Sequence, residues 1–275
     1  MIDQSTLQNQ ITTISEQRPL INSITNFVTI DEVANITSFW GGLPSMSQDQ
    51  KDIEERFRIS DGCHLNMGFI DDKDIELFIE AGKAANNGDT PVAFDPVGAG
   101  GTSERTGAAR EIGNEIDVSI ICGNYGEITA LVQDDANIRG VDVTGEHTDI
   151  EQTAVACANT MDSIVVATGE TDIIADQTTA YKLSVGDSML GSFVGTGCML
   201  GITVNIFDAV AEDSLSAALG GTTAFGIAGE IATKEQDWQG PASYRTAFLD
   251  TVASLNPETF ETIDVEGRIE TVDVR

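Results

Sequence analysis

Two glycines directly before an apolar helical pattern form the sharpest chemical signal in the sequence. They stand in Gly195-Thr196-Gly197-Cys198, and apolar side chains follow at helical spacing as far as Val210. Free N–H groups at the start of a helix, together with the helix dipole, can bind an anion, and glycine lets a phosphate approach the backbone closely. Cys198 then falls in the first turn, where positive potential is expected to lower the pKa of a thiol. A glycine turn followed by a small buried cysteine explains the same pattern, so the motif alone leaves both readings open.

Two carboxylates, Asp95 and Glu127, each come at the end of a short apolar run. Asp95 opens the segment DPVGAG at 95–100, and Glu127 belongs to Asn124-x-x-Glu127. If both lie on one edge of a sheet they can hold Mg²⁺, which usually takes one or two carboxylates plus substrate phosphates. A helix cap or a solvated charge is the alternative for either residue.

A third group of polar and adaptable residues lies near the amino terminus. Asn26 offers both a hydrogen-bond donor and acceptors, and Met46 offers an adaptable apolar contact. Composition alone explains them equally well as an asparagine in a turn and a methionine in a core.

Strand-like and helix-like segments alternate along the chain, which predicts an α/β protein with a mainly parallel central sheet and helices on both faces. No linker divides the chain, so we expect one domain over residues 1–275, with about 266–275 as an acidic extension. In such sheets the ligand lies beyond the carboxyl ends of the strands, where the polar and glycine-rich segments fall. The predicted strands are Cys63–Phe69, Pro91–Asp95, Val118–Cys122 and Ser163–Ala167, with a hairpin of Asp172–Ala175 and Thr179–Leu183. The predicted helices are Asp31–Trp40, Gln48–Arg58, Asp74–Ala85, Ser103–Ile112, Asp149–Thr160, Gly197–Val210, Ser214–Thr233 and Ser243–Ala253.

The charge balance limits the partners of the protein. The 275 residues include 45 Asp and Glu against 14 Lys and Arg, so the formal net charge is −31. Such a surface repels phosphates, which argues against binding to nucleic acid or to an anionic membrane. The acidic residues are spread along the whole chain, as expected of a halophilic protein, because concentrated salt screens self-repulsion.

The remaining sequence features favour a cytoplasmic location. The four cysteines form no CxxC pair and have no zinc-site spacing, so they are expected to be reduced thiols. The polar amino terminus does not resemble a signal peptide, and the most apolar stretch, Gly197–Phe207, is too short to span a bilayer.

Five motifs, taken in order, resemble those of hydroxyethylthiazole kinases, members of the ribokinase-like superfamily in thiamine salvage. The resemblance runs from about Pro19 to about Phe260. GTGC is its most specific part, since related ribokinase-like enzymes generally carry Asp where Cys198 stands. The motifs are Thr25-Asn26-x-Val28 with Ala34-Asn35, DPVGAG at 95–100, GNYGEI at 123–128, VVATGE at 165–170 and GTGC at 195–198.

The resemblance implies a three-layer ribokinase-like fold and a specific reaction. That reaction is transfer of the γ-phosphoryl group of ATP to the hydroxyl of 4-methyl-5-(2-hydroxyethyl)thiazole, with Mg²⁺. It also implies a homotrimer with its thiazole pockets between subunits, so that Asn26 and Met46 can serve a neighbour's site. The roles carried over by motif are Cys198 as the catalytic base position, Met46, Gly195 and Asn26 at the thiazole, Thr168 and Gly197 at ATP, and Asp95 and Glu127 at magnesium.

One position departs from the family pattern. The family typically has Arg directly before GNxxE, where it contacts an ATP phosphate, and this chain has Cys122. A thiol cannot make a charge-assisted bidentate bond. Three explanations remain: another cation such as Arg105 or K⁺ replaces the arginine, ATP binds more weakly, or the protein binds thiazole without catalysis. A kinase for another small alcohol, such as hydroxymethylpyrimidine, is a further alternative, against which Cys198 argues.

Overall fold

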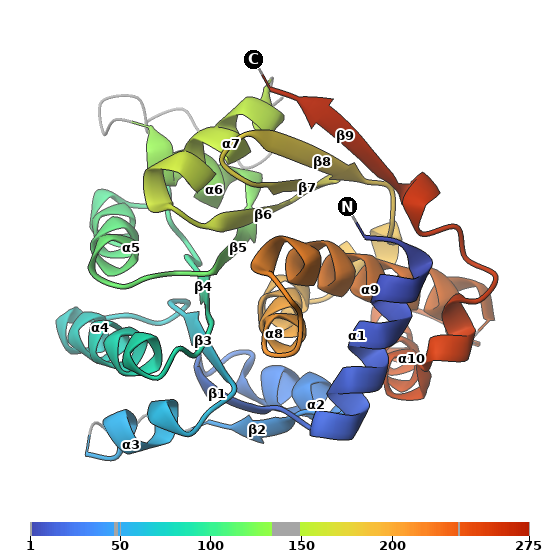
Figure 1. Cartoon of the computed structure of the whole chain (residues 1–275), viewed down its shortest axis with the longest axis horizontal. Coiled ribbons are helices and arrows are strands. Elements are labelled where there is room, and N and C mark those ends of the chain that lie inside the picture. Colours follow the sequence, from blue (N-terminus) through green and yellow to red (C-terminus); the bar gives the residue numbers. More distant parts are fainter. Residues whose placement is uncertain (1, 47–48, 50, 134–148, 236, 275) are drawn as a thin grey trace.

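The computed structural model describes residues 2–274 apart from 47–48, 50, 134–148 and 236, and it is built on one nine-stranded sheet (Figure 1). The strand order is β2-β1-β3-β4-β5-β6-β7-β8-β9. The strands are β1 Leu20–Ile24, β2 Leu43–Ser45, β3 Gly62–Asn66, β4 Val92–Asp95, β5 Ile120–Asn124, β6 Ile164–Thr168, β7 Asp172–Ala175, β8 Thr179–Leu183 and β9 Ile269–Asp273.

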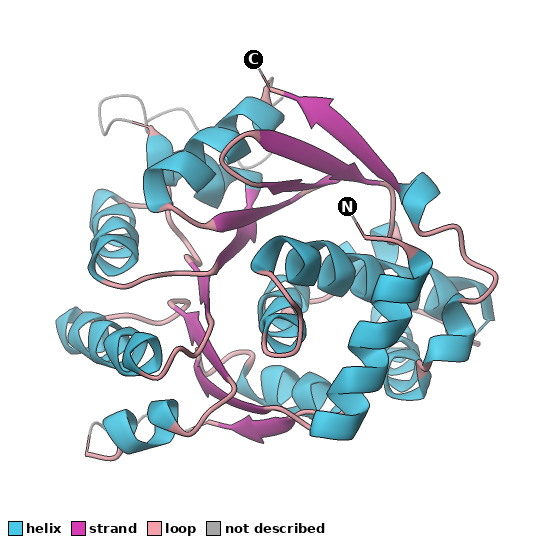
Figure 2. Cartoon of the chain, viewed as in Figure 1, coloured by secondary structure: helices cyan, strands magenta, loops and turns pink. Residues whose placement is uncertain are grey.

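Helices cover both faces of the sheet, as the alternation along the sequence predicts (Figures 1 and 2). Helices α1, α2, α8, α9 and α10 bury their apolar side chains against one face, and α3 to α7 against the other. The three-layer α/β arrangement is thereby confirmed. The helices are α1 Gln4–Gln17, α2 Ile30–Trp40, α3 Ile53–Arg58, α4 Asp72–Asn87, α5 Ser103–Glu115, α6 Tyr125–Val132, α7 Ile150–Met161, α8 Thr196–Asp208, α9 Ser214–Glu235 and α10 Pro241–Ser254, with short 3₁₀ turns η2 Ser188–Ser192, η3 Pro257–Phe260 and η4 Glu266–Arg268.

The strands from β2 to β6 are all parallel to their neighbours, so their carboxyl ends lie along one edge of the sheet. The register aligns the last residues of neighbouring strands: Asn66 pairs with Asp95, and Asn124 with Thr168. Strands β7, β8 and β9 continue the sheet in antiparallel pairing. Polar residues that close separate strands are therefore brought together at one edge, as expected for a parallel sheet.

The carboxyl-terminal segment is not the acidic extension that the sequence suggested for 266–275. Residues Ile269–Asp273 form β9, which pairs with β8 along five residues, from Leu183 opposite Ile269 to Thr179 opposite Asp273. Ile269 is buried in the hydrophobic core on the α8 face of the sheet. The acidic residues of this strand misled the prediction, because an edge strand exposes alternate side chains and can carry charge on them.

Most predicted elements are present, with shifted ends, and five helices and strands were missed. The strand expected at Val118–Cys122 runs from Ile120 to Asn124, and the helix expected from Gln48 begins within the described residues at Ile53. The missed elements are α1, β1, β2, α6 and β9. The polar sequence of α1 hides a narrow apolar stripe of Leu7, Ile11 and Ile14, which are its buried apolar residues.

None of the helices in the described ranges combines the length and the hydropathy that a membrane crossing requires.

Candidate active site

A chain of hydrogen bonds links the ends of β1, β3 and β4 to the first turn of α8. The side-chain nitrogen Nδ2 of Asn26 donates to Oδ1 of Asn66 at 2.9 Å and lies 3.7 Å from Sγ of Cys198. Nδ2 of Asn66 donates in turn to Oδ2 of Asp95 at 2.6 Å. Three residues that the sequence singled out, Asn26, Asp95 and Cys198, are therefore neighbours, and Asn66 joins them.

Asn26 itself is held rigidly by the turn that follows β1. Its Oδ1 accepts the backbone N–H groups of Val28 at 2.9 Å and Thr29 at 3.1 Å, and its Nδ2 also donates to Oγ1 of Thr29 at 2.9 Å. The amide orientation is fixed by these bonds, because only the oxygen can accept both N–H groups. Asn26 thus presents its amide nitrogen toward Cys198.

Asp95 is a buried carboxylate at the carboxyl end of β4. Its exposed fraction is 4%, and burial together with the charge of Glu127 raises the pKa of this carboxyl well above its usual range. Hydrogen bonds from Asn66 and Cys198 act in the opposite direction. A cation placed beside this pair of carboxylates would favour the ionised form of both.

Glu127 is held by backbone N–H groups from two strand-end loops. Its Oε1 accepts from Gly98 at 2.8 Å and its Oε2 from Asn124 at 2.8 Å, while Oδ1 of Asn124 accepts the N–H of Glu127 at 3.0 Å. The last two bonds form the capping box of α6, so the spacing Asn124-x-x-Glu127 has a structural reason as well as a chemical one. Burial raises the pKa of the Glu127 carboxyl, against the effect of these N–H groups and of Arg105.

Arg105, at the start of α5, ties the same loops together. Its Nη1 donates to the carbonyl oxygens of Val97 at 2.8 Å and Met67 at 3.1 Å, and its Nη2 donates to that of Gly68 at 3.1 Å. The guanidinium therefore lies behind the segment DPVGAG, where it opposes the charge of Glu127.

Helix α8 begins at this edge of the sheet and packs closely on it. Gly195 precedes the helix with a φ of +103°, a left-handed conformation that favours glycine. Further along the helix, a Cβ at Gly201 would lie 3.2 Å from Nε2 of His64 and 3.5 Å from Oδ2 of Asp95. The glycine lets the helix approach β3 and β4, which brings Cys198 within reach of Asp95.

Cys198 lies half-buried in the first turn of α8. Its pKa is shifted upward, whereas the sequence predicted a downward shift. Burial and the charge of Asp95 raise the pKa of the Cys198 thiol to about 11, despite polar contacts with Thr29, Asn66 and Asn26. The prediction of a thiol pKa lowered by the helix start is therefore wrong. The helix dipole falls off within one turn, and here burial of the thiol, with the charge of Asp95 added to it, outweighs the dipole.

A cavity of about 410 Å³ opens beside the start of α8, next to this cluster. A Cβ at Gly197 would meet no atom within 4 Å, so the backbone there faces open space. Two positions that the sequence assigned to ATP, Thr168 and Gly197, border the cavity. Its lining residues are Thr168, Gly169, Glu170, Asp172, Val185, Gly186, Asp187, Ser188, Leu190, Gly191, Thr196, Gly197, Leu200, Phe225 and Gly226.

Cys122 is the sequence-assigned ATP position that does not line this cavity. It is 2% exposed and packs on the α8 face of the sheet. Burial raises the pKa of its thiol, and the charges of Asp95, Asp172 and Glu127 act in the same direction. The environment of Cys122 is thus one that favours a cation over an anion.

The sequence-assigned thiazole positions lie toward the β1–β2 side of the edge. Met46 follows β2 and packs partly buried against the α8-side core. Large apolar side chains are exposed nearby: Phe27 is 68% and Phe69 64% exposed, and their ring centroids are 5.5 Å apart. Asn66 was not among the residues predicted from the sequence; its signal would have been a polar residue at the end of a strand next to the strand that Asp95 closes.

Within the residues that the structure describes, no three His, Cys, Asp or Glu side chains come together in an arrangement that could hold a metal ion.

The sequence and the structure of this chain were compared with those of known proteins, and both comparisons found similar proteins. The model of the hydroxyethylthiazole kinase family matches residues 11–258. A hydroxyethylthiazole kinase of Natronomonas pharaonis is 51% identical over 94% of this chain and 93% of its own length, and one of Haloquadratum walsbyi is 45% identical over 98% and 94%. A solved structure described as a hydroxyethylthiazole kinase protein from Pyrococcus horikoshii is 28% identical, with a TM-score of 0.85 over 98% of this chain and 100% of its own.

More distant structures share the fold alone. A ribokinase-like superfamily protein from Enterococcus faecalis is 8% identical with a TM-score of 0.63, and it covers 94% of this chain. The predicted ribokinase-like architecture is therefore confirmed.

Proposed function

This chain belongs to the hydroxyethylthiazole kinase family, and from that premise we propose what its strand-end site does. The site transfers the γ-phosphoryl group of ATP to the hydroxyl of 4-methyl-5-(2-hydroxyethyl)thiazole, as part of thiamine salvage. The observation that supports this most is the convergence of Asn26, Asp95 and Cys198 beside a cavity that opens at the start of α8.

We place ATP in the cavity that Thr168 and Gly197 border. The nucleoside lies between the β6–β7 turn and α9, and the phosphates point to the start of α8, where free N–H groups and the helix dipole favour an anion. Phosphoryl transfer requires mainly positioning and charge stabilisation from the protein. Gly197 serves this role because no side chain intervenes between its backbone and the cavity.

Asp95 and Glu127 fit a magnesium ion on the phosphate side of the site. Carboxylates are ligands that Mg²⁺ accepts, and the ion usually completes its shell with water and substrate phosphates. The raised pKa of Asp95 marks a pair of buried carboxylates whose ionisation a cation would favour. When bound, Mg²⁺ would neutralise charge on the phosphates. The protein contributes by holding Asp95 through Asn66 and Glu127 through two backbone N–H groups.

Cys198 meets the hydroxyl of the thiazole substrate as a neutral thiol. With a pKa of about 11 it stays protonated at neutral pH, so it orients the hydroxyl rather than carrying a standing negative charge. Asn26 fixes the thiol from the other side. A loose transition state needs little help from a base, which makes such an orienting role sufficient.

The chain acts as a homotrimer in which Met46 contributes to a neighbour's thiazole pocket. Asn26, for which the sequence suggested the same role, is buried beside Cys198 of its own chain and serves that chain's site instead. The exposed pair Phe27 and Phe69, together with Val28 at 72% and Val194 at 74% exposure, gives this edge an apolar surface suited to a second copy. Light scattering should give three times the chain mass, and a monomer with full activity would contradict the shared pocket. The acidic charge and the four free cysteines support action in a salt-rich cytoplasm.

The deciding experiment measures ADP release in molar KCl with Mg²⁺. We expect ADP on addition of the thiazole alcohol and none on addition of hydroxymethylpyrimidine. ADP with the pyrimidine but not the thiazole would instead favour the other small-alcohol kinase.

A thiazole-binding protein without catalysis is the second candidate, and Cys122 in place of the family arginine favours it. In that case the thiazole raises the melting temperature but no ADP forms.

A further inference from the structure

One wall of the cavity is a loop that is held from outside the site. The loop joins β8 to α8, and Val185, Gly186, Asp187 and Leu190 from it line the cavity. It has little regular structure apart from the 3₁₀ turn η2. Its position must therefore be set by what it packs on.

The loop rests on a stretch of α9 that carries no side chains at the contact. A Cβ at Gly226 would lie 2.5 Å from Cγ2 of Val185, and one at Gly229 would lie 2.7 Å from Cδ1 of Leu190. These two glycines allow direct contact between the loop and the helix backbone. Gly186 has a φ of +98°, so the loop also turns there in a glycine conformation.

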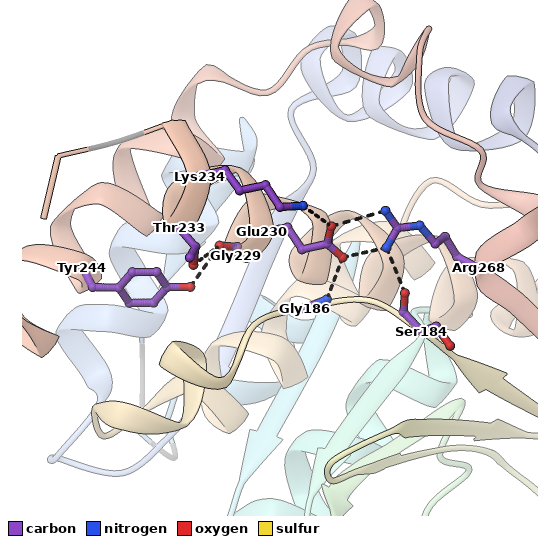
Figure 3. A network of polar contacts seen from close by, with 8 residues as sticks. All are labelled: Ser184, Gly186, Gly229, Glu230, Thr233, Lys234, Tyr244 and Arg268. Atoms are coloured by element: carbon purple, nitrogen blue, oxygen red, sulfur yellow. Dashed lines mark hydrogen bonds and ion pairs between the residues drawn. The ribbon is translucent and has the colours of Figure 1, made fainter.

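Glu230 fastens this loop one residue beyond the second glycine (Figure 3). Its Oε1 accepts the backbone N–H of Gly186 at 3.2 Å and also Nη1 of Arg268 at 2.7 Å. Nη1 of Arg268 donates to the carbonyl oxygen of Ser184 at 3.0 Å, and the N–H of Ser184 donates to the carbonyl of Arg268 at 2.9 Å. The cavity wall is thus bonded on one side to α9 and on the other to the residue that precedes β9.

The network is charged and partly buried. The side chain of Glu230 is 14% exposed and that of Arg268 33%. Burial opposes ionisation of Glu230, but bonds from Arg268 and Lys234 outweigh it and hold the pKa of the carboxyl below its ordinary value. Partly buried pairs of this kind are screened by salt much less than exposed pairs, so the link persists in concentrated salt.

The loop also connects this network to the phosphate side of the site. Oγ1 of Thr196 donates to the carbonyl oxygen of Leu190 at 2.7 Å and lies 3.2 Å from that of Phe193. Thr196 is the second residue of the GTGC motif. The wall therefore borders the phosphate side of the cavity as well as the nucleoside side, so its position bears on the whole nucleotide.

We propose that Glu230, secured by Arg268, is a positioning residue for the nucleotide that holds the wall Ser184–Leu190 in its binding geometry. The inference rests on the proposed function, in which ATP occupies this cavity. Neither residue lines the cavity, so both act through the loop. Through Arg268, the carboxyl-terminal segment thereby contributes to nucleotide binding.

The test compares steady-state kinetics of Glu230→Ala, Glu230→Gln, Arg268→Ala and Arg268→Lys with the parent. Glu230→Ala and Arg268→Ala should raise the KM for ATP by about tenfold, with kcat and the KM for the thiazole within about twofold. Glu230→Gln and Arg268→Lys keep part of the bonding and should lie between these and the parent. Glu115→Ala is the matched control, since it removes the exposed pair with Lys83 on the opposite face of the sheet and should leave all three constants unchanged.

The outcomes separate this inference from the proposed function. If the parent neither binds nor uses ATP, the proposed function fails. If the parent uses ATP and the folded variants keep its KM, the positioning role is overturned. A uniform loss of kcat and of affinity for both substrates in Glu230→Gln and Arg268→Lys would also overturn it, because that result indicates general loosening.

Discussion

Two cysteines carry the chemistry that is particular to this chain at the scale of single residues. Cys198 lies beside Asn26 and Asp95 at the start of α8, and Cys122 lies buried on the neighbouring strand β5. The pKa of each thiol is raised, in both cases first by burial and then by carboxylate charge. Both are thus neutral at physiological pH, and both meet negative potential from Asp95.

Cys198→Ala should lower kcat by about 100-fold and leave the KM for ATP nearly unchanged, because the hydroxyl loses the group that orients it. The kcat of the parent should be flat between pH 7 and 9, since a thiol with a pKa of about 11 stays protonated throughout that range. A kcat that rises tenfold per pH unit would show instead that the thiolate is the base.

Cys198→Asp tests whether residue 198 has a chemical role or only fills space in the core. Related ribokinase-like enzymes carry Asp here, so a chemical role predicts that activity is retained. An active Ala variant beside an unfolded Asp variant would contradict the catalytic assignment, since the residue would then act only as a buried filler.

Cys122→Arg should lower the KM for ATP in low salt by an amount worth on the order of 1–3 kcal/mol. Asp95, Asp172 and Glu127 all act on this position, so a guanidinium there is balanced by carboxylates before ATP binds. Cys122→Ser is the control, because it keeps the size of the side chain without adding charge. An unchanged or higher KM for ATP would mean that position 122 does not face a phosphate.

At the scale of elements, the dipole of α8 gives its first turn a positive potential and its last turn a negative one. Its start presents N–H groups to the cavity, and its last residue, Asp208, is a carboxylate at the negative end of the helix dipole. Asp208 is 8% exposed, and its Oδ2 has no hydrogen-bond partner among the described residues. Burial raises the pKa of Asp208 to about 6, with a further contribution from Asp213.

Asp208→Asn should raise the free energy of unfolding at pH 7 by on the order of 2 kcal/mol, because the folded state then no longer holds a disfavoured charge. The pKa of Asp208 is about 6 in the folded chain against an ordinary 3.8, so the parent loses stability as the pH rises from about 4 to 6. The gain should therefore vanish below about pH 4, where the carboxyl is protonated in both states. Melting temperatures across this range measure it, with Asp250→Asn on the exposed side of α10 as the control. A gain of equal size at every pH would point to a packing effect.

At the scale of the whole molecule, acidic residues greatly outnumber the basic residues that could neutralise them. The 14 basic residues face 45 acidic ones, and several of the basic residues are already used in pairs such as Lys83–Glu115 and Arg245–Glu32. The excess repels itself in dilute buffer. The hydrophobic clusters on both faces of the sheet must hold the chain together against this repulsion.

Melting temperature and activity should both rise from dilute buffer to molar KCl, because the Debye length falls to about 3 Å at 1 M and repulsion is screened. NaCl at equal ionic strength separates screening from a specific effect of K⁺ on ATP binding. A melting temperature that is flat or falls over this range would refute the halophilic interpretation.

The sequence by itself determined the class of fold and the family, and it singled out residues that the structure brings together. Local patterns carry these features: alternating apolar runs predict strands and helices, and short motifs such as GTGC place chemistry at strand ends. Asn26, Asp95 and Cys198 were identified in this way, and the structure brings them into contact. A motif fixes which groups are present, because residue type and spacing are local properties.

Only the tertiary structure decided how these groups behave. The pKa of Cys198 is raised rather than lowered because the folded chain buries the thiol and places Asp95, 103 residues earlier in the chain, beside it. The segment that was predicted to be an acidic extension forms the last strand of the sheet. Arg268, directly before that strand, donates to Glu230, which lies 38 residues earlier in the chain. Burial and contacts between distant segments set charge states and positions, and no local pattern of residues contains them.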